Sequence, residues 1–131
     1  MSSISIHAVR KEFKGHQALK SISLEVKDQE FCVLLGPSGC GKTTLMRIIA
    51  GLETQTSGDV RIGDRSMNGL PPRERNIAMV FQNYAVFPHM TIRENIGFGL
   101  RMKKTPEAKL KALVEGAASM MHIEHLSLIH I

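Results

Sequence analysis

The stretch Gly36-Pro37-Ser38-Gly39-Cys40-Gly41-Lys42-Thr43 decides how the rest of this sequence is interpreted. It follows the pattern of a phosphate-binding loop, which is a glycine, four variable residues, and then Gly-Lys-Ser/Thr. Its three glycines lack a Cβ, so the backbone can bend tightly and bring N–H groups up to an anion. Lys42 supplies a flexible positive charge suited to the β- and γ-phosphates of a nucleotide. The Thr43 hydroxyl is suited to the Mg²⁺ ion that accompanies those phosphates.

The residues on both sides of the loop support this interpretation. The apolar run Glu30–Leu35 before it predicts a buried strand. The segment Thr43–Ala50 after it has apolar residues at helical spacing, and Gly51 follows at the position where helices commonly end. The order strand, glycine loop, helix is the context that phosphate binding by this pattern requires.

Bulk properties limit the alternatives. The chain has 131 residues, which is at most one ordinary domain, with 43% hydrophobic and 22% charged residues. No signal peptide or membrane-spanning run is visible, and Cys32 and Cys40 do not suggest a disulfide framework, which fits a reducing cytoplasm. The net charge of +5 is scattered and not interleaved with aromatic residues. A solvated surface with a nucleotide pocket is therefore favoured over nucleic-acid binding.

Alternating apolar residues predict further strands. Segments 4–10 and 19–26 are close enough in sequence to form an antiparallel pair, joined by a turn at residues 13–16. Residues 59–62 predict a short strand, and residues 63–76 a surface loop. The apolar segment Ile77–Phe81, which ends at Gln82, predicts another strand.

Two helices are predicted after these strands. Thr91 and Glu94 have the spacing of a capping box, and Gly97 and Gly99 predict that this helix is short. A second helix is expected with Thr105 at the N-cap and proline at the first helical position. One of its faces carries a group of apolar residues: Leu110, Leu113, Val114, Ala117 and Met121.

The sequence resembles the N-terminal part of the ATP-binding subunit of an ABC transporter, and within that family the ATPases of carbohydrate importers. The resemblance rests on residues 36–45, 49–53 and 57–58, and most specifically on residues 71–91, PPRERNIAMVFQNYAVFPHMT. It continues through residues 94–100 and covers about residues 4 to 125. It implies an α/β fold of the P-loop NTPase class, with an antiparallel β subdomain, a partial parallel core sheet carrying the P-loop helix, and the start of a helical subdomain.

The resemblance also assigns site residues. Lys42 and Gln82 take the catalytic positions, and Thr43 with Gln82 would hold Mg²⁺. Phe13 occupies the position of an aromatic residue that stacks on adenine, although the residue type alone would suit a core position equally well. The implied ATP-binding set is Phe13, Gly36, Pro37, Ser38, Gly39, Cys40, Gly41, Lys42, Thr43 and Thr44.

The implied function is ATP-driven import of a solute, most typically a carbohydrate, at the cytoplasmic face of the membrane. The segment Tyr84–Glu94 resembles the surface that contacts the membrane permease subunits, although its apolar residues could equally be core. A second ATP-binding subunit is expected as a dimer partner, a solute-binding protein takes part indirectly, and no nucleic acid is expected. Polyamine or glycerol-phosphate import, and a soluble ABC ATPase of DNA repair or translation, are the alternatives.

The family's acidic strand end with its catalytic glutamate, its signature loop and its switch histidine are absent from this sequence. We therefore expect residues 1–125 to be the N-terminal part of a truncated ATP-binding domain that alone lacks ATP hydrolysis. Residues 126–131, Leu-Ser-Leu-Ile-His-Ile, depart from the family and match the translation of a transposon adapter used in sequencing libraries. We expect this tail to be non-native.

Overall fold

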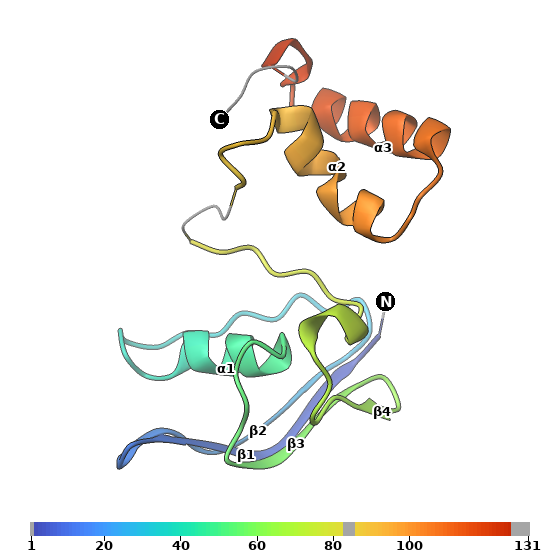
Figure 1. The fold of residues 1–131 in the computed structure, drawn as a ribbon. Coiled ribbons are helices and arrows are strands. Elements are labelled where there is room, and N and C mark those ends of the chain that lie inside the picture. The colour runs from blue at the N-terminus through green and yellow to red at the C-terminus, as the bar shows by residue number, and fades with distance from the viewer. Residues whose placement is uncertain (1, 83–85, 127–131) are drawn as a thin grey trace. The chain divides into compact units, whose positions relative to one another are not determined.

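The computed structural model of the chain describes residues 2–82 and 86–126. The chain divides into two compact units, Met1–Met79 and Val80–Ile131, and each is described by itself (Figure 1). Within the described residues, no helix has both the length and the apolar character needed to cross a membrane.

The first unit contains a four-stranded antiparallel sheet with the order β2-β1-β3-β4. Its strands are β1 (Ile4–Phe13), β2 (His16–Val26), β3 (Ser57–Ile62) and β4 (Arg65–Ser66). The predicted pairing of the first two strands is confirmed, with Ile4 opposite Val26 and Phe13 opposite His16 across the turn. The predicted third strand is confirmed as β3, which pairs with the other side of β1. The predicted surface loop differs slightly, because it contains β4 and the short 3₁₀ helix η1 (Pro72–Glu74).

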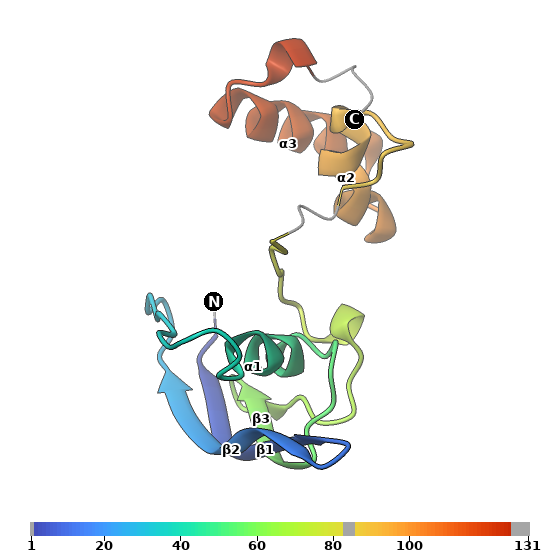
Figure 2. The same cartoon turned by 90° about the vertical axis from the view of Figure 1, so that its left-hand side faces the viewer.

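Helix α1 (Lys42–Ile49) lies over one face of this sheet, as both views show (Figures 1 and 2). The core of the first unit forms between them, because α1 buries Leu45 and Ile48 on its inner side. The buried residues of this core come from the sheet, from α1 and from the loop after β4: Ile6, Val9, Leu19, Leu45, Ile48, Val60 and Met67. The predicted helix after the phosphate loop is therefore confirmed, and it is fixed to the sheet by its apolar face.

The predicted partial parallel sheet is not formed among the described residues, where the only sheet is antiparallel. The segments Glu30–Leu35 and Ile77–Phe81 have strand-like sequences but adopt no strand. Several of their side chains are open to solvent, with Phe31 91%, Leu35 89% and Val80 95% exposed, while Ile77, Met79 and Phe81 are partly buried. A strand needs a neighbour to accept and donate its ladder hydrogen bonds, and no segment of the described chain pairs with these two.

The second unit contains α2 (Ile92–Met102), α3 (Glu107–Met120) and the short 3₁₀ helix η2 (Glu124–Leu126). The predicted capping box is confirmed: the Thr91 hydroxyl accepts from the Glu94 N–H at 3.2 Å, and the Thr91 N–H donates to the Glu94 carboxylate at 2.7 Å. The prediction that this helix is short because of its glycines is wrong, since α2 has 11 residues. Gly97 is buried in the contact with α3, where an added Cβ would lie 3.2 Å from Val114 Cγ2. Here glycine allows two helices to approach closely, and that contact offsets its low helix propensity.

Helix α3 differs from its prediction in two ways. Its N-cap is Pro106, one residue later than expected, and Thr105 provides no cap. Of the apolar residues predicted to share one face, Leu110 and Val114 are buried together with Ala118, while Leu113 and Met121 are exposed. The buried stripe is narrower than predicted because within this unit α3 packs mainly against a single helix, α2.

Candidate nucleotide-binding site

The phosphate loop enters α1 through Gly41, which is the N-cap of the helix and has a φ of 93°. This left-handed conformation is one that residues with a side chain rarely adopt. Space is also limited, because a Cβ on Gly41 would lie 2.6 Å from the Ala18 carbonyl oxygen and 2.7 Å from Leu19 Cδ2. Gly41 therefore fixes the start of α1 against strand β2, and glycine is the residue that fits there.

Lys42, the first residue of α1, turns its side chain back over the loop. Its ammonium donates to the carbonyl oxygens of Gly36 at 2.6 Å and Pro37 at 2.8 Å, and lies 3.4 Å from Cys40 Sγ. The positive charge is thus held inside the curve of the loop, where its own backbone carbonyls solvate it. A polyphosphate entering the loop would take over the ammonium as a stronger, charge-assisted partner.

The N-terminus of α1 has the electrostatic character of an anion site. It has no side-chain cap and no acidic residue in its first turn, while Arg47 lies in its last turn. The first N–H groups of a helix have no partner within the helix and carry partial positive charge. Several predicted site residues around this end are solvent-accessible: Pro37, Ser38, Gly39, Cys40 and Thr43. Thr44 follows in the helix and is partly buried.

A shallow pocket of about 320 Å³ connects the phosphate loop to the β1–β2 hairpin. Its lining consists of residues from β2 and from the loop: His16, Gln17, Ala18, Leu19, Lys20, Ile22, Gly39 and Cys40. The hairpin and the loop lie on the same side of the first unit (Figures 1 and 2). Phe13, at the end of β1, is 40% exposed and pairs across the turn with His16, one of the lining residues. The structure thus places Phe13 next to this pocket without making it part of the lining.

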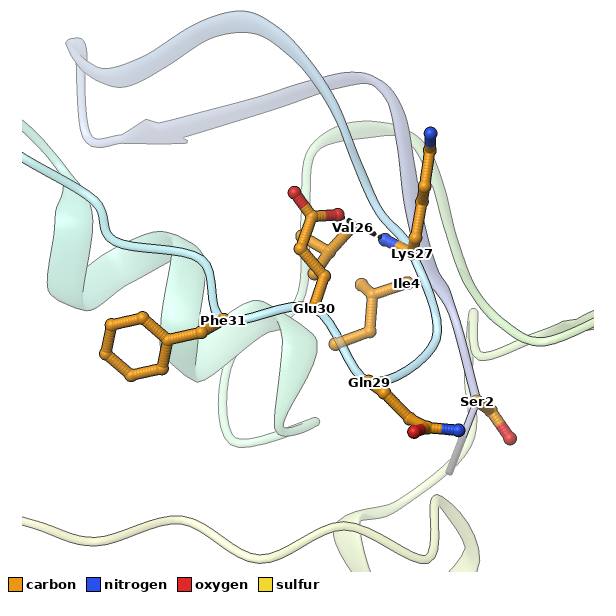
Figure 3. Close-up of a pocket in the computed structure, with 7 residues that line it drawn as sticks. All are labelled: Ser2, Ile4, Val26, Lys27, Gln29, Glu30 and Phe31. Atoms are coloured by element: carbon orange, nitrogen blue, oxygen red, sulfur yellow. Dashed lines mark hydrogen bonds between the residues drawn. The ribbon is translucent and has the colours of Figure 1, made fainter.

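Two larger hollows in the first unit lie apart from the phosphate loop. One, of about 650 Å³, is lined by residues at one end of the β1–β2 pair and by the segment after it: Ser2, Ile4, Val26, Lys27, Gln29, Glu30 and Phe31. Figure 3 shows the Phe31 ring directed away from Ile4 and Val26, while the Glu30 carboxylate accepts from the Lys27 N–H at 2.7 Å. The other, of about 480 Å³, shares Ser2 and Ile4 with it. Neither contains a residue of the phosphate loop.

The remaining predicted site residues belong to the second unit. Gln82 is exposed and follows directly on the apolar segment 77–81. Its predicted role in holding Mg²⁺ concerns both units and stays a prediction. Of the predicted permease-contacting segment Tyr84–Glu94, residues 84 and 85 lie outside the described residues.

The described part of that segment is held in place by Asn95, which sequence analysis did not single out. The Asn95 amide nitrogen donates to the carbonyls of Phe87, Met90 and Thr91 at 3.0, 3.2 and 3.0 Å, and its oxygen accepts from the Phe87 N–H at 2.8 Å. The Phe87 ring packs on Phe98 of α2, with ring centroids 4.5 Å apart. Val86 and Phe87 remain partly exposed. A sequence signal existed, since asparagine commonly bonds backbone groups near a helix start.

Arg75 is a second residue that the sequence did not reveal, because it lies in a run of charged and proline residues typical of a solvated loop. It is only 6% exposed. Its guanidinium donates to the carbonyls of Ile48 at 2.8 Å, Ile49 at 3.0 Å and Leu70 at 2.9 Å. It thereby closes the C-terminal end of α1, and burial lowers the pKa of Arg75. Gly51 makes room for it, since a Cβ there would lie 2.5 Å from Arg75 Nε.

Comparison with known proteins identifies the family of the chain. The profile of the ABC transporter family matches residues 19–129. The chain is 51% identical over 126 residues to the sulfoquinovosyl glycerol transport ATP-binding protein SmoE of Agrobacterium fabrum, and 53% identical over 125 residues to the sn-glycerol-3-phosphate import ATP-binding protein UgpC of Brucella abortus. These matches cover 96% and 95% of this chain but only 35% and 36% of the relatives. The chain therefore spans about a third of the length of the curated relatives it matches.

Among solved structures, the chain is similar to the dimeric ATP-binding cassette MJ0796 in a post-hydrolysis state bound to ADP and Pi. The TM-score is 0.85 at 28% identity, over 97% of this chain and 61% of that one. A second dimeric structure of the same bacterial ABC transporter cassette gives a TM-score of 0.86 at 30% identity. The chain belongs to the ABC transporter family, and its fold is that of the family's ATP-binding cassettes.

Proposed function

We propose that this chain is the nucleotide-binding part of an ATP-binding subunit that powers the import of a solute by ATP binding and hydrolysis. The observation that carries the proposal is the loop Gly36–Thr43, whose ammonium, glycines and open helix N-terminus converge on one small volume. That combination suits the triphosphate of a nucleotide. The names of the relatives and the post-hydrolysis state of the similar cassette support ATP as the nucleotide.

In this proposal each loop residue has one task. The backbone N–H groups at the start of α1 bind the α- and β-phosphates, and Lys42 leaves its two carbonyl partners for the β- and γ-phosphates. Phe13 stacks on the adenine ring. Mg²⁺ would neutralise charge that develops on the transferred phosphoryl group. The Thr43 hydroxyl suits this ion, because Mg²⁺ takes few protein ligands and completes its coordination shell with phosphate oxygens and water. Gln82 is proposed as a second ligand that also orients the attacking water.

Hydrolysis is proposed for the complete product of the gene and not for residues 1–125 alone, which carry the binding loop without the family's catalytic glutamate, signature loop and switch histidine. We propose that a second ATP-binding subunit completes the site as a dimer partner, as in the dimeric structures of the similar cassette. Membrane permease subunits would contact the segment 84–94, and the protein would act at the cytoplasmic face of the membrane.

The solute is proposed to be a carbohydrate or a related compound. The relatives named above are ATP-binding proteins for sulfoquinovosyl glycerol and sn-glycerol-3-phosphate, so glycerol-phosphate import is equally compatible. Polyamine import and a soluble non-transport ATPase are the remaining alternatives. Co-purification of the complete gene product with an integral membrane subunit supports transport, whereas its isolation without one supports the soluble alternative.

The first test is direct binding of Mg-ATP to the complete gene product and to its Lys42→Ala variant. Removing the ammonium deletes charge-assisted contacts to two phosphates, so we expect affinity to fall by about 10- to 100-fold. Lys109→Ala, which removes an exposed lysine of α3, is the matched control and should bind as the parent does. Equal affinity of the Lys42→Ala variant and the parent would contradict the proposal.

A further inference from the structure

Lys11 of β1 has an unusually complete set of partners for a lysine at a sheet. Its ammonium lies 2.8 Å from Glu53 Oε1, donates to the Thr54 carbonyl at 2.7 Å, and lies 4.5 Å from the centroid of the Phe13 ring. Its side chain is only 12% exposed. Three partners hold the ammonium in place, which a solvated surface lysine would not require.

The partners of Lys11 are themselves fixed. Glu53 follows the C-terminal end of α1, and its carboxylate also accepts from the Thr54 N–H at 3.0 Å. The hydrogen bond from Lys11, followed by that from the Thr54 backbone, lowers the pKa of Glu53, so this carboxylate stays charged at neutral pH. Farther along, the Thr56 N–H donates to the Arg10 carbonyl at 2.8 Å, and the Thr56 hydroxyl accepts from the Glu12 N–H at 3.0 Å. The segment after α1 is therefore attached to β1 on both sides of Lys11.

The contact with Lys11 determines how Phe13 is presented. The ammonium covers one face of the ring, and the side chain is nevertheless 40% exposed. A base can therefore approach this ring only from the face opposite Lys11. Its cross-strand neighbour His16 lines the pocket that reaches Gly39 and Cys40 of the phosphate loop. A planar base that is joined to phosphates in the loop would find this ring at the rim of the same pocket.

We propose that Lys11 is a positioning residue for base recognition: anchored by Glu53 and Thr54, it holds the Phe13 ring by a cation–π contact so that the opposite face stacks on the adenine of the bound nucleotide. The inference rests on the proposed nucleotide binding and assigns a role to a residue that does not touch the nucleotide. Lys11 therefore contributes to affinity for the base and not to affinity for the phosphates.

The test compares two ligands, Mg-ATP and inorganic tripolyphosphate with Mg²⁺, on the complete gene product. Lys11→Met keeps the length of the side chain and removes its charge, and we expect ATP affinity to fall about two- to fivefold, which is the low end of the range for a cation–π contact. Tripolyphosphate, which has no base, should bind equally well to both proteins. Lys11→Arg keeps a cation over the ring and should restore most of the ATP affinity. In a Phe13→Ala background, Lys11→Met should have no further effect.

Several outcomes would overturn the inference. Equal weakening of ATP and tripolyphosphate by Lys11→Met would show a general structural role, and so would an undiminished effect in the Phe13→Ala background. If Lys11→Met does not fold, Glu53→Gln loosens the same ammonium without removing it, and an unchanged ratio of ATP to tripolyphosphate affinity in that variant overturns the inference as well. Failure of the parent protein to bind either ligand would instead refute the proposed function, which keeps the two failures distinguishable.

Discussion

Two glycines of the phosphate loop have similar backbone angles but different surroundings. Gly39 has a φ of 80° and nothing within 4 Å of the point where a Cβ would lie, whereas Gly41 has a φ of 93° with the Ala18 carbonyl oxygen 2.6 Å from that point. The left-handed conformation costs an ordinary residue roughly 1–2 kcal/mol at either position. At Gly41 a methyl group would in addition press against the backbone of β2, which cannot rotate away as a side chain can.

We therefore predict different costs for alanine at these two positions. Gly39→Ala should lower the free energy of unfolding by about 1–2 kcal/mol, and Gly41→Ala by about 3 kcal/mol or more, because strain and collision add. Thermal unfolding in the absence of nucleotide measures the stability of both variants without a contribution from ligand binding. Equal losses of stability would show that β2 does not constrain the start of α1.

At the scale of single residues, the sequence names candidate site residues but does not give their geometry. The loop pattern identified Lys42 and Thr43 because the spacing of glycine and lysine is local in sequence. The backbone partners of Lys42, and the ammonium of Lys11 above Phe13, depend on how the chain folds in three dimensions. Side-chain contacts between residues more than 40 positions apart, such as Lys11 with Glu53, leave no local pattern.

At the scale of elements, α1 is held at both ends, by Gly41 at its start and by Arg75 at its end. Arg75 is buried and donates to carbonyl oxygens at the C-terminal end of α1. Its positive charge also complements the negative end of the helix dipole. Truncating it would leave the Ile49 and Leu70 carbonyls without this donor, whereas the Ile48 carbonyl would keep the Gly51 N–H at 3.1 Å. Each such acceptor costs about 1–3 kcal/mol.

We predict that Arg75→Ala lowers the free energy of unfolding by about 3 kcal/mol, since some of the three carbonyls can be reached by water. The neighbouring Arg73 is the matched control. It is exposed and its guanidinium lies 3.6 Å from Glu74, an arrangement in which Arg73→Ala costs about 0.5 kcal/mol or less. Urea unfolding of both variants measures the difference. A loss of unfolding free energy for Arg75→Ala no larger than that for Arg73→Ala would contradict the role of Arg75 in holding the end of α1.

Elements specified by local sequence signals were predicted correctly, and elements that depend on a distant pairing partner were not. The β1–β2 hairpin, α1 and the capped start of α2 were predicted because turn residues, apolar spacing and the Thr91–Glu94 box are local signals. The two strands predicted at Glu30–Leu35 and Ile77–Phe81 were wrong, because an apolar run expresses a preference for burial and cannot supply a pairing partner. The length of α2 was underestimated since helix propensity takes no account of the packing of Gly97 on α3.

At the scale of the whole molecule, the feature with the largest consequence is the exposure of large apolar side chains to solvent. Phe31 and Leu35 are both nearly fully exposed on one unpaired extended segment. Burial of a side chain of this size contributes about 1.5–3 kcal/mol. An extended segment that is paired with no strand and carries large apolar side chains is also a template for pairing with another chain.

We predict that the 131-residue chain, expressed by itself, self-associates and binds a hydrophobic dye. The double variant Phe31→Ser/Leu35→Ser should reduce both effects, because it removes the two large side chains while leaving the core of the first unit intact. Met120→Ser, which removes an exposed apolar residue from α3, is the control and should change neither. Sedimentation velocity and dye fluorescence are the measurements, and a monodisperse monomer of the parent chain would refute the prediction.

The inward-folded Lys42 has a consequence for ligand discrimination. Any anion that enters the loop must first compete with the Gly36 and Pro37 carbonyls for the same ammonium, so the two hydrogen bonds act as an energetic threshold. A single small anion such as chloride offers the ammonium and the helix N-terminus fewer contacts than a chain of phosphates does. A chain of phosphates contacts the ammonium and the helix N-terminus together, and so exceeds the threshold cooperatively. We therefore expect Lys42 to favour a chain of phosphates over simple anions in this loop.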